Sequence, residues 1–470
     1  MHTDEAVNGY ITGQLLAGDS FQYDPQDRHG PTLYLATVPV VRAFGEKSLT
    51  QLNERTVRLV PVIFSVLVIL LLAAAASQIG FVSCVVAALL FAVAPLPVYY
   101  SRYFIHEMLF VAGTLGFALS GWRTLERKSI RAAIAAGACA AWMLACKETA
   151  LLHFAAFAVP LIWWIWIRRT DLTRRSSRWN ALWKPALITA ATFLVVTFVF
   201  YTWGGKNWSG PIDLIRSIPR FAQRAGGEGH EKSVAYYWSL LIGNGHGMLI
   251  IGLALLAFVV SMRSIARQLF SEPAITELNR KLPLQLWSLY SVAILVIYCV
   301  IPYKNPWLAL NFWFALAILA GTGFQLLWLR FPKMLWRCCL AAILGIGIWR
   351  AGVETQKWVF ARPADDRNPY AYAHTVDDVI SLPEKIQKLA GANANPFVAV
   401  VAEDPWPLPW YLRKFQKVGF YQPSQFPTDA DFYITSLEAA AQMETHLESW
   451  RPDFVGIRPE VLMLLWKRSQ

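Results

Sequence analysis

The chain contains few charged residues and few cysteines for its length. Only 16% of its 470 residues are charged, and its 31 acidic residues are outnumbered by 43 basic ones. Four of the six cysteines lie in or at the ends of apolar runs, and Cys338 and Cys339 are adjacent inside another, so neither disulfide nor zinc-ligand spacing is present. The sequence also has no internal repeat and no low-complexity tract. These absences exclude a disulfide-stapled scaffold, a zinc module and a repeat architecture.

Apolar residues make up most of the chain instead. The composition is 56% hydrophobic with 21 Trp, and the mean hydropathy is +0.37. This is more apolar surface than one soluble core needs, and it indicates an α-helical polytopic membrane protein. The net charge of +12 does not indicate a nucleic-acid partner, because Lys and Arg are spread over short loops rather than gathered in one patch.

About ten apolar runs approach the length of a membrane-spanning helix. They lie near residues 57–77, 79–99, 103–121, 130–146, 149–167, 184–203, 240–261, 284–302, 306–328 and 335–350. Every second connection between them is basic, namely residues 123–131, 168–184, 263–281 and 330–337. The positive-inside rule makes these connections cytoplasmic, so those near residues 100, 147, 204–235 and 303 are expected to face outward. The long 204–235 connection is also basic, but acidic residues are interspersed in it.

The distribution of hydropathy predicts three regions. Residues 1–56 read as an outer loop with interfacial helices, and we expect a spanning helix to precede them, because no apolar segment here carries them across a membrane. Residues 57–351 form the transmembrane helical domain. Residues 352–470 read as a small extracytoplasmic α/β domain. Its expected strands lie near 397–402, 418–421, 432–435 and 454–457, and its expected helices near 376–389 and 437–447.

The first charged motif, Asp4-Glu5, precedes an amphipathic-looking stretch. Either residue can simply favour a helix N-terminus through the helix dipole. The functional alternative is a carboxylate near the membrane surface that acts as general base toward an acceptor hydroxyl or amine. Asp4 is the preferred candidate for this base.

The second motif places Arg102 at the outer end of one span and His106-Glu107 at the start of the next. Arg102 can be an interfacial residue that extends its charge to water. Glu107 is directly followed by apolar residues, so it enters the helix at membrane depth, where an ionisable group is costly unless paired. His106 beside one Glu lacks a full ligand set, so no metal site is assigned, although a divalent ion is left open.

Two further cationic motifs lie at tight outer turns. Lys147-Glu148 has apolar runs on both sides and almost no loop, and the two neighbours cannot share one helix face, so each is expected to meet a different partner. A structural ion pair to another helix is the alternative role for this motif. Lys304 follows Tyr303 and precedes Asn305-Pro306, which is turn chemistry. Together with Arg102, these lysines would supply the counter-charges for a phosphate headgroup.

His153 and His246 lie in or near spans, where histidines more often pack or hydrogen-bond between helices, so they are left out of the site.

These motifs resemble those of the GT-C superfamily of integral-membrane glycosyltransferases, which includes protein O-mannosyltransferases and lipid A aminoarabinose transferases. The resemblance rests on Asp4-Glu5 in the first outer loop, Tyr99 to Arg102 followed by Glu107, and Lys147-Glu148 after a later helix. Further motifs are similar to the branch described as flippase-activity-associated membrane proteins: Tyr23-Asp24-Pro25, His29-Gly30-Pro31, Tyr303 to Trp307, Asn368-Pro369-Tyr370 and Trp406 to Tyr411.

The resemblance implies a function and a set of site residues. A polyprenyl-phosphate-linked sugar would be the donor, and Asp4 would be the general base with Glu5 as its neighbour. The donor phosphate and pocket would be formed by Arg102, His106, Glu107, Lys147, Glu148, Lys304 and His29. The acceptor would be a lipid, glycan or protein at the outer face of the cytoplasmic membrane.

The sequence leaves two other classes open. One is a non-catalytic or transport component that assists translocation of lipid-linked oligosaccharide, in which the same basic residues would bind the headgroup. The other is a membrane-anchored sensor, which only the outer C-terminal domain favours.

Overall fold

The computed structural model describes residues 1–24, 26, 29–174, 176–243, 245–270 and 275–468, with the side chains of 169–181, 245 and 266–281 left undescribed. Most basic residues of the connections 168–184 and 263–281 therefore lie outside the described side chains, as does Pro25. The chain divides into two compact units. We call residues 1–19, 36–57 and 364–470 the small unit, and residues 20–35 with 58–363 the helical unit.

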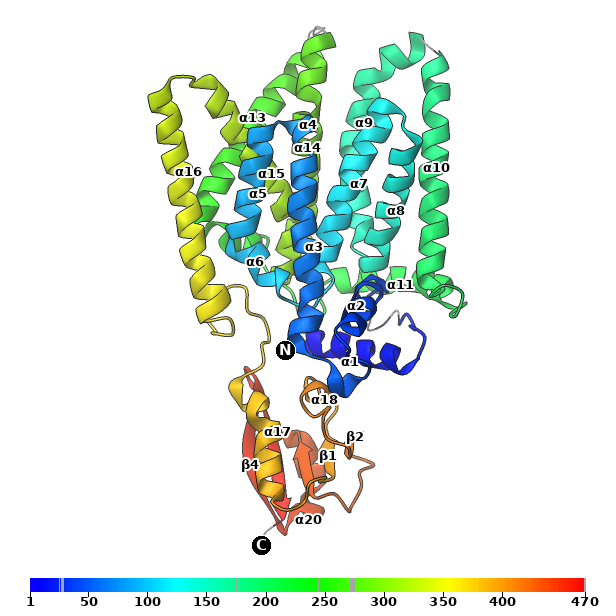
Figure 1. The fold of residues 1–470 in the computed structure, drawn as a ribbon, viewed down its shortest axis with the longest axis vertical. Coiled ribbons are helices and arrows are strands. Elements are labelled where there is room, and N and C mark those ends of the chain that lie inside the picture. Colours follow the sequence, from blue (N-terminus) through cyan, green and yellow to red (C-terminus); the bar gives the residue numbers. More distant parts are fainter. Residues whose placement is uncertain (25, 27–28, 175, 244, 271–274, 469–470) are drawn as a thin grey trace. The chain divides into compact units, whose positions relative to one another are not determined.

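The helical unit is built from long apolar helices (Figure 1). They are α3 (Glu54–Ala74, whose first turn belongs to the small unit), α4 (Ala76–Ile79), α5 (Phe81–Val93), α6 (Pro95–Ser101), α7 (Glu107–Arg127), α8 (Ile130–Cys146), α9 (Ala150–Arg174), α10 (Ser176–Tyr201), α13 (Gly245–Phe270), α14 (Ile275–Val300), α15 (Leu310–Arg330) and α16 (Met334–Thr355). Among the described residues, eight helices are long and apolar enough to cross a membrane, or nine if the bent pair α5–α6 is one span.

The ten predicted apolar runs are thus helical, but several depart from one straight span. The run near 240–261 begins in α12 (Tyr236–Ile242) and continues in α13. The run near 79–99 is broken at Ala94, where Pro95 begins α6 and the axis bends by 62°. Proline there cannot continue the hydrogen-bond ladder of α5. The run 130–146 forms α8, which has 17 residues and falls short of the usual span length.

Helix α15 forms the core of the helical unit. Its residues 310–324 are all buried. Gly321 lies against the backbone oxygen of Ser83 in α5, and Gly323 against that of Leu253 in α13, so closely that a Cβ atom at either position would overlap the oxygen. Small residues allow membrane helices this close backbone approach.

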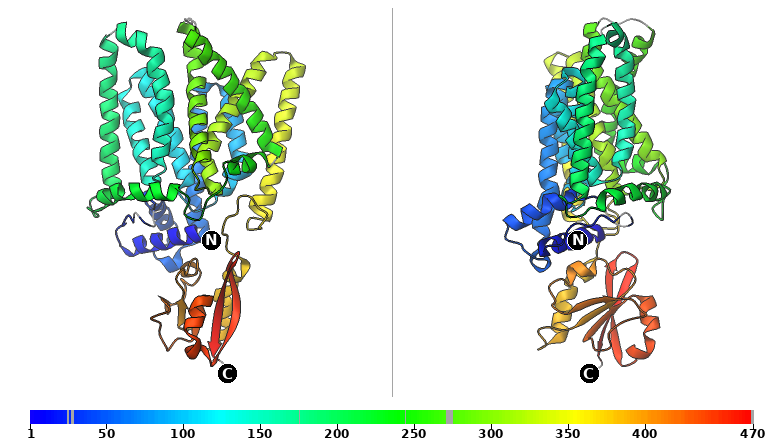
Figure 2. Two further views of the ribbon diagram at one scale, coloured as in Figure 1. Left: turned by 180° about the vertical axis from the view of Figure 1, so that it is seen from behind. Right: turned by 90° about the vertical axis from the view of Figure 1, so that its right-hand side faces the viewer.

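One end of the helical unit carries most of its short elements. These are α6, α11 (Gly210–Ala225), α12 (Tyr236–Ile242), the 3₁₀ turn η2 (Pro306–Ala309) and the π-helical turn η3 (Gln356–Ala361). Helix α11 lies across the ends of the long helices rather than along them (Figure 2). It exposes Ile212, Ile215 and Ile218, which is the pattern of an interfacial helix.

The small unit contains the C-terminal α/β domain. Its five-stranded sheet has the order β2-β1-β3-β5-β4, built from β1 (Val398–Val401), β2 (Val418–Tyr421), β3 (Phe432–Thr435), β4 (Trp450–Arg458) and β5 (Val461–Arg468). Strands β2 and β3 run parallel to β1, whereas β5 is antiparallel to β3 and β4. Helix α17 (Asp377–Ala390) covers one face, and α19 (Leu437–Gln442) with α20 (Glu444–Leu447) covers the other (Figure 2).

The predicted strands and helices of this domain are confirmed, with one strand missed. Strand β5 was not expected, because its run of apolar residues lacks the alternation of a half-buried strand. The β4–β5 hairpin turns at Glu460, which has a positive φ of 65°. The small unit also holds α1 (Thr3–Ala17), most of α2 (Thr32–Ala43), the turn η1 (Leu49–Gln51) and the short helix α18 (Leu408–Tyr411).

Candidate functional site

A buried ion pair joins the start of α7 to the end of α8. Glu107 is the first residue of α7, and Lys147 directly follows α8, so the antiparallel helices bring them together across 40 residues of chain. Lys147 Nζ donates to Glu107 Oε1 at 2.5 Å, and the residues are only 5% and 1% exposed. Burial alone would lower the pKa of Lys147, but the charge and hydrogen bond of Glu107 outweigh it and raise that pKa.

Glu148 turns to a different set of partners. The hydroxyl of Tyr23 donates to Glu148 Oε1 at 2.5 Å, and His29 Nδ1 lies 3.0 Å from Oε2. Burial opposes ionisation of this carboxyl, but the charge of His29 and the hydrogen bonds from His29 and Tyr23 lower the pKa of Glu148 to about 2. The prediction that Lys147 and Glu148 meet different partners is confirmed.

His106 fixes the His29-Gly30 loop from the other side. Its Nε2 lies 3.1 Å from the Gly30 oxygen, and its ring meets those of His29 and Tyr34 edge-on, at 5.5 and 5.9 Å between centroids. Burial, followed by the charges of His29 and Lys147, holds the pKa of His106 well below its usual value, so the imidazole is neutral at pH 7. Gly30 packs on the backbone oxygen of Ala145 and leaves no room for a Cβ atom.

This cluster does not provide a metal-ligand set. Across the described part of the chain, no three His, Cys, Asp or Glu side chains come together in the arrangement of a metal site. The divalent ion that the sequence left open therefore stays a prediction without assigned ligands.

Lys304 is a buried cation of a different kind. It follows α14, and its side chain is 1% exposed. Its ammonium donates to the backbone oxygens of Lys232, at 3.3 Å, and of Ile301. Within the described residues no carboxylate pairs with it, and burial lowers the pKa of Lys304. Two carbonyls occupy two of the three donors of an ammonium group, so one donor and the net charge are left for another ligand.

The segment of Lys304 is held by the long connection 204–235. The Lys304 amide donates to the His230 oxygen at 3.1 Å, and the Lys232 amide donates to the Pro302 oxygen, also at 3.1 Å. These bonds, with the isolated bridge between Glu231 and Tyr303, form a short two-stranded clasp. The position of the Lys304 backbone therefore depends on residues 230–232, which are not among the predicted site residues.

Arg102 has partners of its own in η3. Its guanidinium donates to the Val359 oxygen at 3.0 Å and lies 4.6 Å over the ring of Phe360, both in η3. The motif nevertheless touches that of Lys304, because the rings of Tyr100 and Trp307 pack edge-on at 6.3 Å. Arg102 is exposed, which agrees with the interfacial role that the sequence left open for it.

In the small unit, Asp4 and Glu5 lie in the first turn of α1 and have different environments. Glu5 is fully buried, and its Oε2 accepts the amide hydrogen of His2 at 3.0 Å, as in a capping box. The structural alternative is thus confirmed for Glu5. The Asp4 side chain is half exposed, with its carboxylate 4.0 Å from His2 Nδ1.

The C-terminal domain holds α1 from one side, within the same unit. Trp410 is fully buried under Gly9, where an added Cβ would lie 2.5 Å from the ring, and Trp406 meets Tyr10 edge-on at 5.8 Å. Arg458 of β4 donates to the Thr3 hydroxyl at 3.4 Å. The motif Trp406 to Tyr411, which entered only through the resemblance, therefore positions the helix that carries Asp4.

Sequence reasoning missed several residues that support the site. Tyr23 was noted only as part of a motif, although it donates to Glu148, and Tyr201 packs edge-on against it at 5.1 Å. Thr32 donates to the Ala145 oxygen at 3.1 Å and ties its loop to α8. No local pattern marks these residues, because each acts through a partner far away in the chain.

The two histidines left out of the site do connect helices, as predicted. His153 Nδ1 lies 2.8 Å from the Tyr290 hydroxyl, between α9 and α14. His246 Nδ1 lies 2.6 Å from Glu354 Oε2, between α13 and α16.

Comparisons with known proteins now place this architecture. The chain is similar in structure to ArnT from Cupriavidus metallidurans, with a TM-score of 0.64 and 14% identity for the apo form, over 98% of this chain and 93% of ArnT. The form of ArnT bound to undecaprenyl phosphate has a TM-score of 0.62 and 15% identity, again over 98% of this chain and 93% of ArnT. The chain is also similar to the archaeal oligosaccharyltransferase AglB from Archaeoglobus fulgidus, in complex with an inhibitory peptide and a dolichol-phosphate. The TM-score is 0.55 and the identity is 10%, over 96% of this chain and 69% of AglB.

These likenesses define the fold: the chain has the helical architecture of ArnT and AglB, and among its described residues eight or nine helices are long and apolar enough to cross a membrane. Residues 39–203 also match the family described as dolichyl-phosphate-mannose-protein mannosyltransferase. No curated protein matches the chain in a sequence search. The resemblance to the GT-C superfamily inferred from the motifs is confirmed.

Proposed function

We propose that the protein is a glycosyltransferase that moves a sugar from a polyprenyl-phosphate-linked donor to an acceptor at the outer face of the cytoplasmic membrane. The C-terminal domain would lie on that outer face. The proposed donor class is supported by the fold and by the undecaprenyl phosphate and dolichol-phosphate named for its structural neighbours. A lipid, glycan or protein hydroxyl or amine would be the acceptor, with no nucleic acid involved.

The observation that carries this proposal is the environment of Lys304. A buried charge without a counter-charge is costly, and it persists where a ligand supplies the missing partner. Lys304 has only backbone oxygens near its ammonium among the described residues. An anionic phosphate would accept a hydrogen bond from the remaining N–H of the Lys304 ammonium. Its negative charge would also raise the pKa of Lys304, which burial lowers.

In the proposed reaction, Asp4 accepts the proton of the acceptor while the acceptor oxygen or nitrogen attacks the anomeric carbon of the donor. The bond from that carbon to the phosphate oxygen breaks, and the configuration inverts by direct displacement. Polyprenyl phosphate leaves with the bonding electrons, and cationic side chains stabilise its charge. The proposed phosphate and pocket residues are Lys304, Lys147, Arg102, His29, His106, Glu107 and Glu148, and Glu5 holds the first turn of α1.

The general base is tested by Asp4→Asn, with Asp19→Asn as the matched control because Asp19 is also exposed and lies just after α1. Membranes from cells fed a radiolabelled sugar are assayed for transfer of label out of the polyprenyl-phosphate pool. We expect a loss of about 10²- to 10⁴-fold for Asp4→Asn, typical of a missing general base, and parental transfer for Asp19→Asn. Parental transfer by Asp4→Asn would show that the base is wrongly assigned.

The phosphate site is tested by Lys304→Met and Lys304→Arg in the full chain. Undecaprenyl phosphate is the probe, and its binding is measured in detergent micelles. We expect weakened binding for Lys304→Met and partial recovery for Lys304→Arg, because only the second keeps the charge. Equal binding by parent and Lys304→Met would refute the proposal for this residue.

The same variants distinguish the proposed glycosyltransferase from the transport alternative. A transport component would show translocation of lipid-linked oligosaccharide with no sugar transfer in the parent chain, and Asp4→Asn would leave that translocation unchanged.

A further inference from the structure

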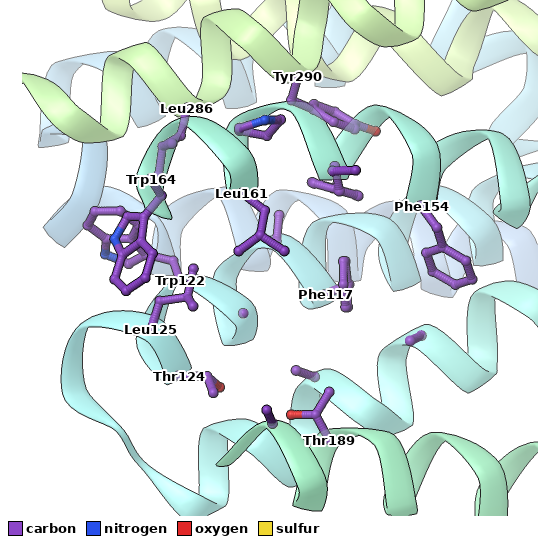
Figure 3. Close-up of a pocket in the computed structure, with 18 of the residues that line it drawn as sticks. Phe117, Trp122, Thr124, Leu125, Phe154, Leu161, Trp164, Thr189, Leu286 and Tyr290 are labelled. Carbon is purple, nitrogen blue, oxygen red and sulfur yellow. The ribbon is translucent and has the colours of Figure 1, made fainter. Parts of the chain in front are cut away.

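A large apolar cavity lies at the end of the helical unit where α7 ends and α8 begins, opposite to the end that carries Glu107 (Figure 3). Its volume is about 660 Å³. The cavity is lined by the second half of α7, the first half of α8 and parts of α9, α10 and α14. Phe117, Phe154, Leu161 and Trp164 are among the side chains that face it (Figure 3).

The polar side chains on its walls turn to partners in the protein. Thr124 donates to the Ser120 oxygen at 2.8 Å, and Thr189 donates to the Ala133 oxygen at 3.1 Å. The Trp164 indole donates to Glu126 Oε1 at 3.2 Å. These groups therefore offer little to a polar ligand or to water, and an apolar cavity of this kind favours hydrocarbon.

The side-chain amide of Gln78 at the cavity is not satisfied in this way. Gln78, at the end of the first span, lines the cavity, and its Nε2 is buried without a hydrogen-bond partner among the described residues. An amide N–H in this position needs an acceptor oxygen. The ester carbonyl of a glycerolipid is an acceptor that lies between a hydrocarbon chain and a polar head.

Two of the helices that form the cavity, α7 and α10, also carry positive charge beside it. Arg123 lies between the lining residues Trp122 and Thr124, and Lys184 lies between the lining residues Leu182 and Pro185. Arg127, Lys128 and Arg131 follow where α7 ends and α8 begins; Arg127 and Arg131 are exposed, and Lys128 is half-buried. Basic groups beside a cavity between membrane helices are complementary to an anionic lipid head.

We propose that this cavity binds an anionic glycerophospholipid, with an acyl chain between α7–α8–α10 and α9–α14 and its phosphate among the basic residues of the helix ends. The site lies at the opposite end of α7 from Glu107, so it is separate from the proposed donor-phosphate site. It does not depend on the proposed function. The lipid would fill a space between α9 and α10 that the side chains leave open.

The test uses the full chain, purified in detergent and stripped of lipid. Dioleoylphosphatidylglycerol or dioleoylphosphatidylcholine is added, and bound lipid is counted by native mass spectrometry. We expect phosphatidylglycerol to bind at lower concentration. Since each cation near a membrane surface contributes about 1 kcal/mol, or roughly 5-fold, the double variant Arg123→Gln with Lys184→Gln should weaken it about 30-fold. Lys333→Gln, in another basic connection, is the control.

A second pair of variants tests where the acyl chain lies. Ala190→Trp fills the cavity from α10, whereas Ala191→Trp places the same side chain one residue further, at an exposed position outside the lining. We expect Ala190→Trp to lose the lipid and Ala191→Trp to keep it. Equal binding of the two lipids, retention of phosphatidylglycerol by Ala190→Trp, or its displacement by undecaprenyl phosphate at equal concentration would each overturn the proposal.

Discussion

Removal of one partner of the Lys147–Glu107 pair should be among the most destabilising single changes in the helical unit. Both groups are almost completely buried, and their charged atoms lie 2.5 Å apart. Lys147→Met leaves the Glu107 carboxylate buried without its cation, and Glu107→Met does the same to the ammonium. Breaking a buried pair from one side costs about 3–5 kcal/mol, because the remaining charge keeps its desolvation penalty and loses its partner.

The double variant Lys147→Met with Glu107→Met should recover most of that loss. Replacing both members of a buried ion pair by apolar side chains of similar volume is often neutral or stabilising. The cycle of single and double variants should therefore give a coupling energy of about 3 kcal/mol or more. The free energy of unfolding can be measured by titrating dodecyl maltoside micelles with sodium dodecyl sulfate.

A matched control is the pair Arg216–Asp213 in α11, at 3.1 Å, whose arginine is exposed. The Arg216 side chain is 70% exposed, so Arg216→Gln should change the free energy of unfolding by no more than about 0.5 kcal/mol. Two results would contradict this prediction. One is a free energy of unfolding of both single variants within about 1 kcal/mol of the parent, and the other is a loss in the double variant equal to the sum of the two single losses.

The double variant also separates stability from binding. It should fold and yet bind undecaprenyl phosphate more weakly than the parent, because the proposed phosphate site has lost one of its lysines. Unchanged binding by the folded double variant would mean that the pair is structural only, which is the alternative role that the sequence left open for Lys147.

Three further predictions follow from single positions. The pKa of Glu148 in the folded protein is about 2, below its usual 4.5, so the ionised carboxylate stabilises the fold above pH 4.5. About 3 kcal/mol of this stabilisation is lost as the pH falls toward 2. Glu148→Gln should therefore flatten the pH dependence of the free energy of unfolding. Gly30→Ala should lower the melting temperature through overlap with the end of α8, whereas Gly252→Ala, with open space at its Cβ, should not. Trp410→Ala should speed hydrogen exchange of the α1 amides, and Phe420→Ala, at a half-exposed position on β2, should leave that exchange unchanged.

The Lys147-Glu148 motif, which has almost no loop, illustrates how much can be predicted from the local sequence. Lys147-Glu148 stands between apolar runs, and adjacent residues do not share one helix face, so separate partners were predictable. The identity of those partners was not, because Glu107 and His29 are separated from them by 40 and 119 residues. Nothing in the sequence between these positions encodes which helix end packs on which.

The first-turn motif of α1 shows the same division. The sequence suggested either a helix N-terminus or a catalytic carboxylate for Asp4-Glu5. The structure assigns the cap to Glu5, which is fully buried, and leaves the Asp4 carboxylate half exposed. The clasp of Lys304 on residues 230–232 had no counterpart in the sequence reasoning, because a backbone pairing between two loops leaves no side-chain pattern.

The sequence by itself determined where the membrane helices lie and where each charged motif interrupts them. A helix that crosses hydrocarbon must be apolar over a fixed length, and that requirement is written locally in the chain. The tertiary structure decided which buried charges neutralise each other, as Lys147 and Glu107 do, and that the Lys304 ammonium donates to backbone oxygens among the described residues. Electrostatic partners are chosen by packing between distant segments, and at membrane depth that choice sets the cost of every buried charge.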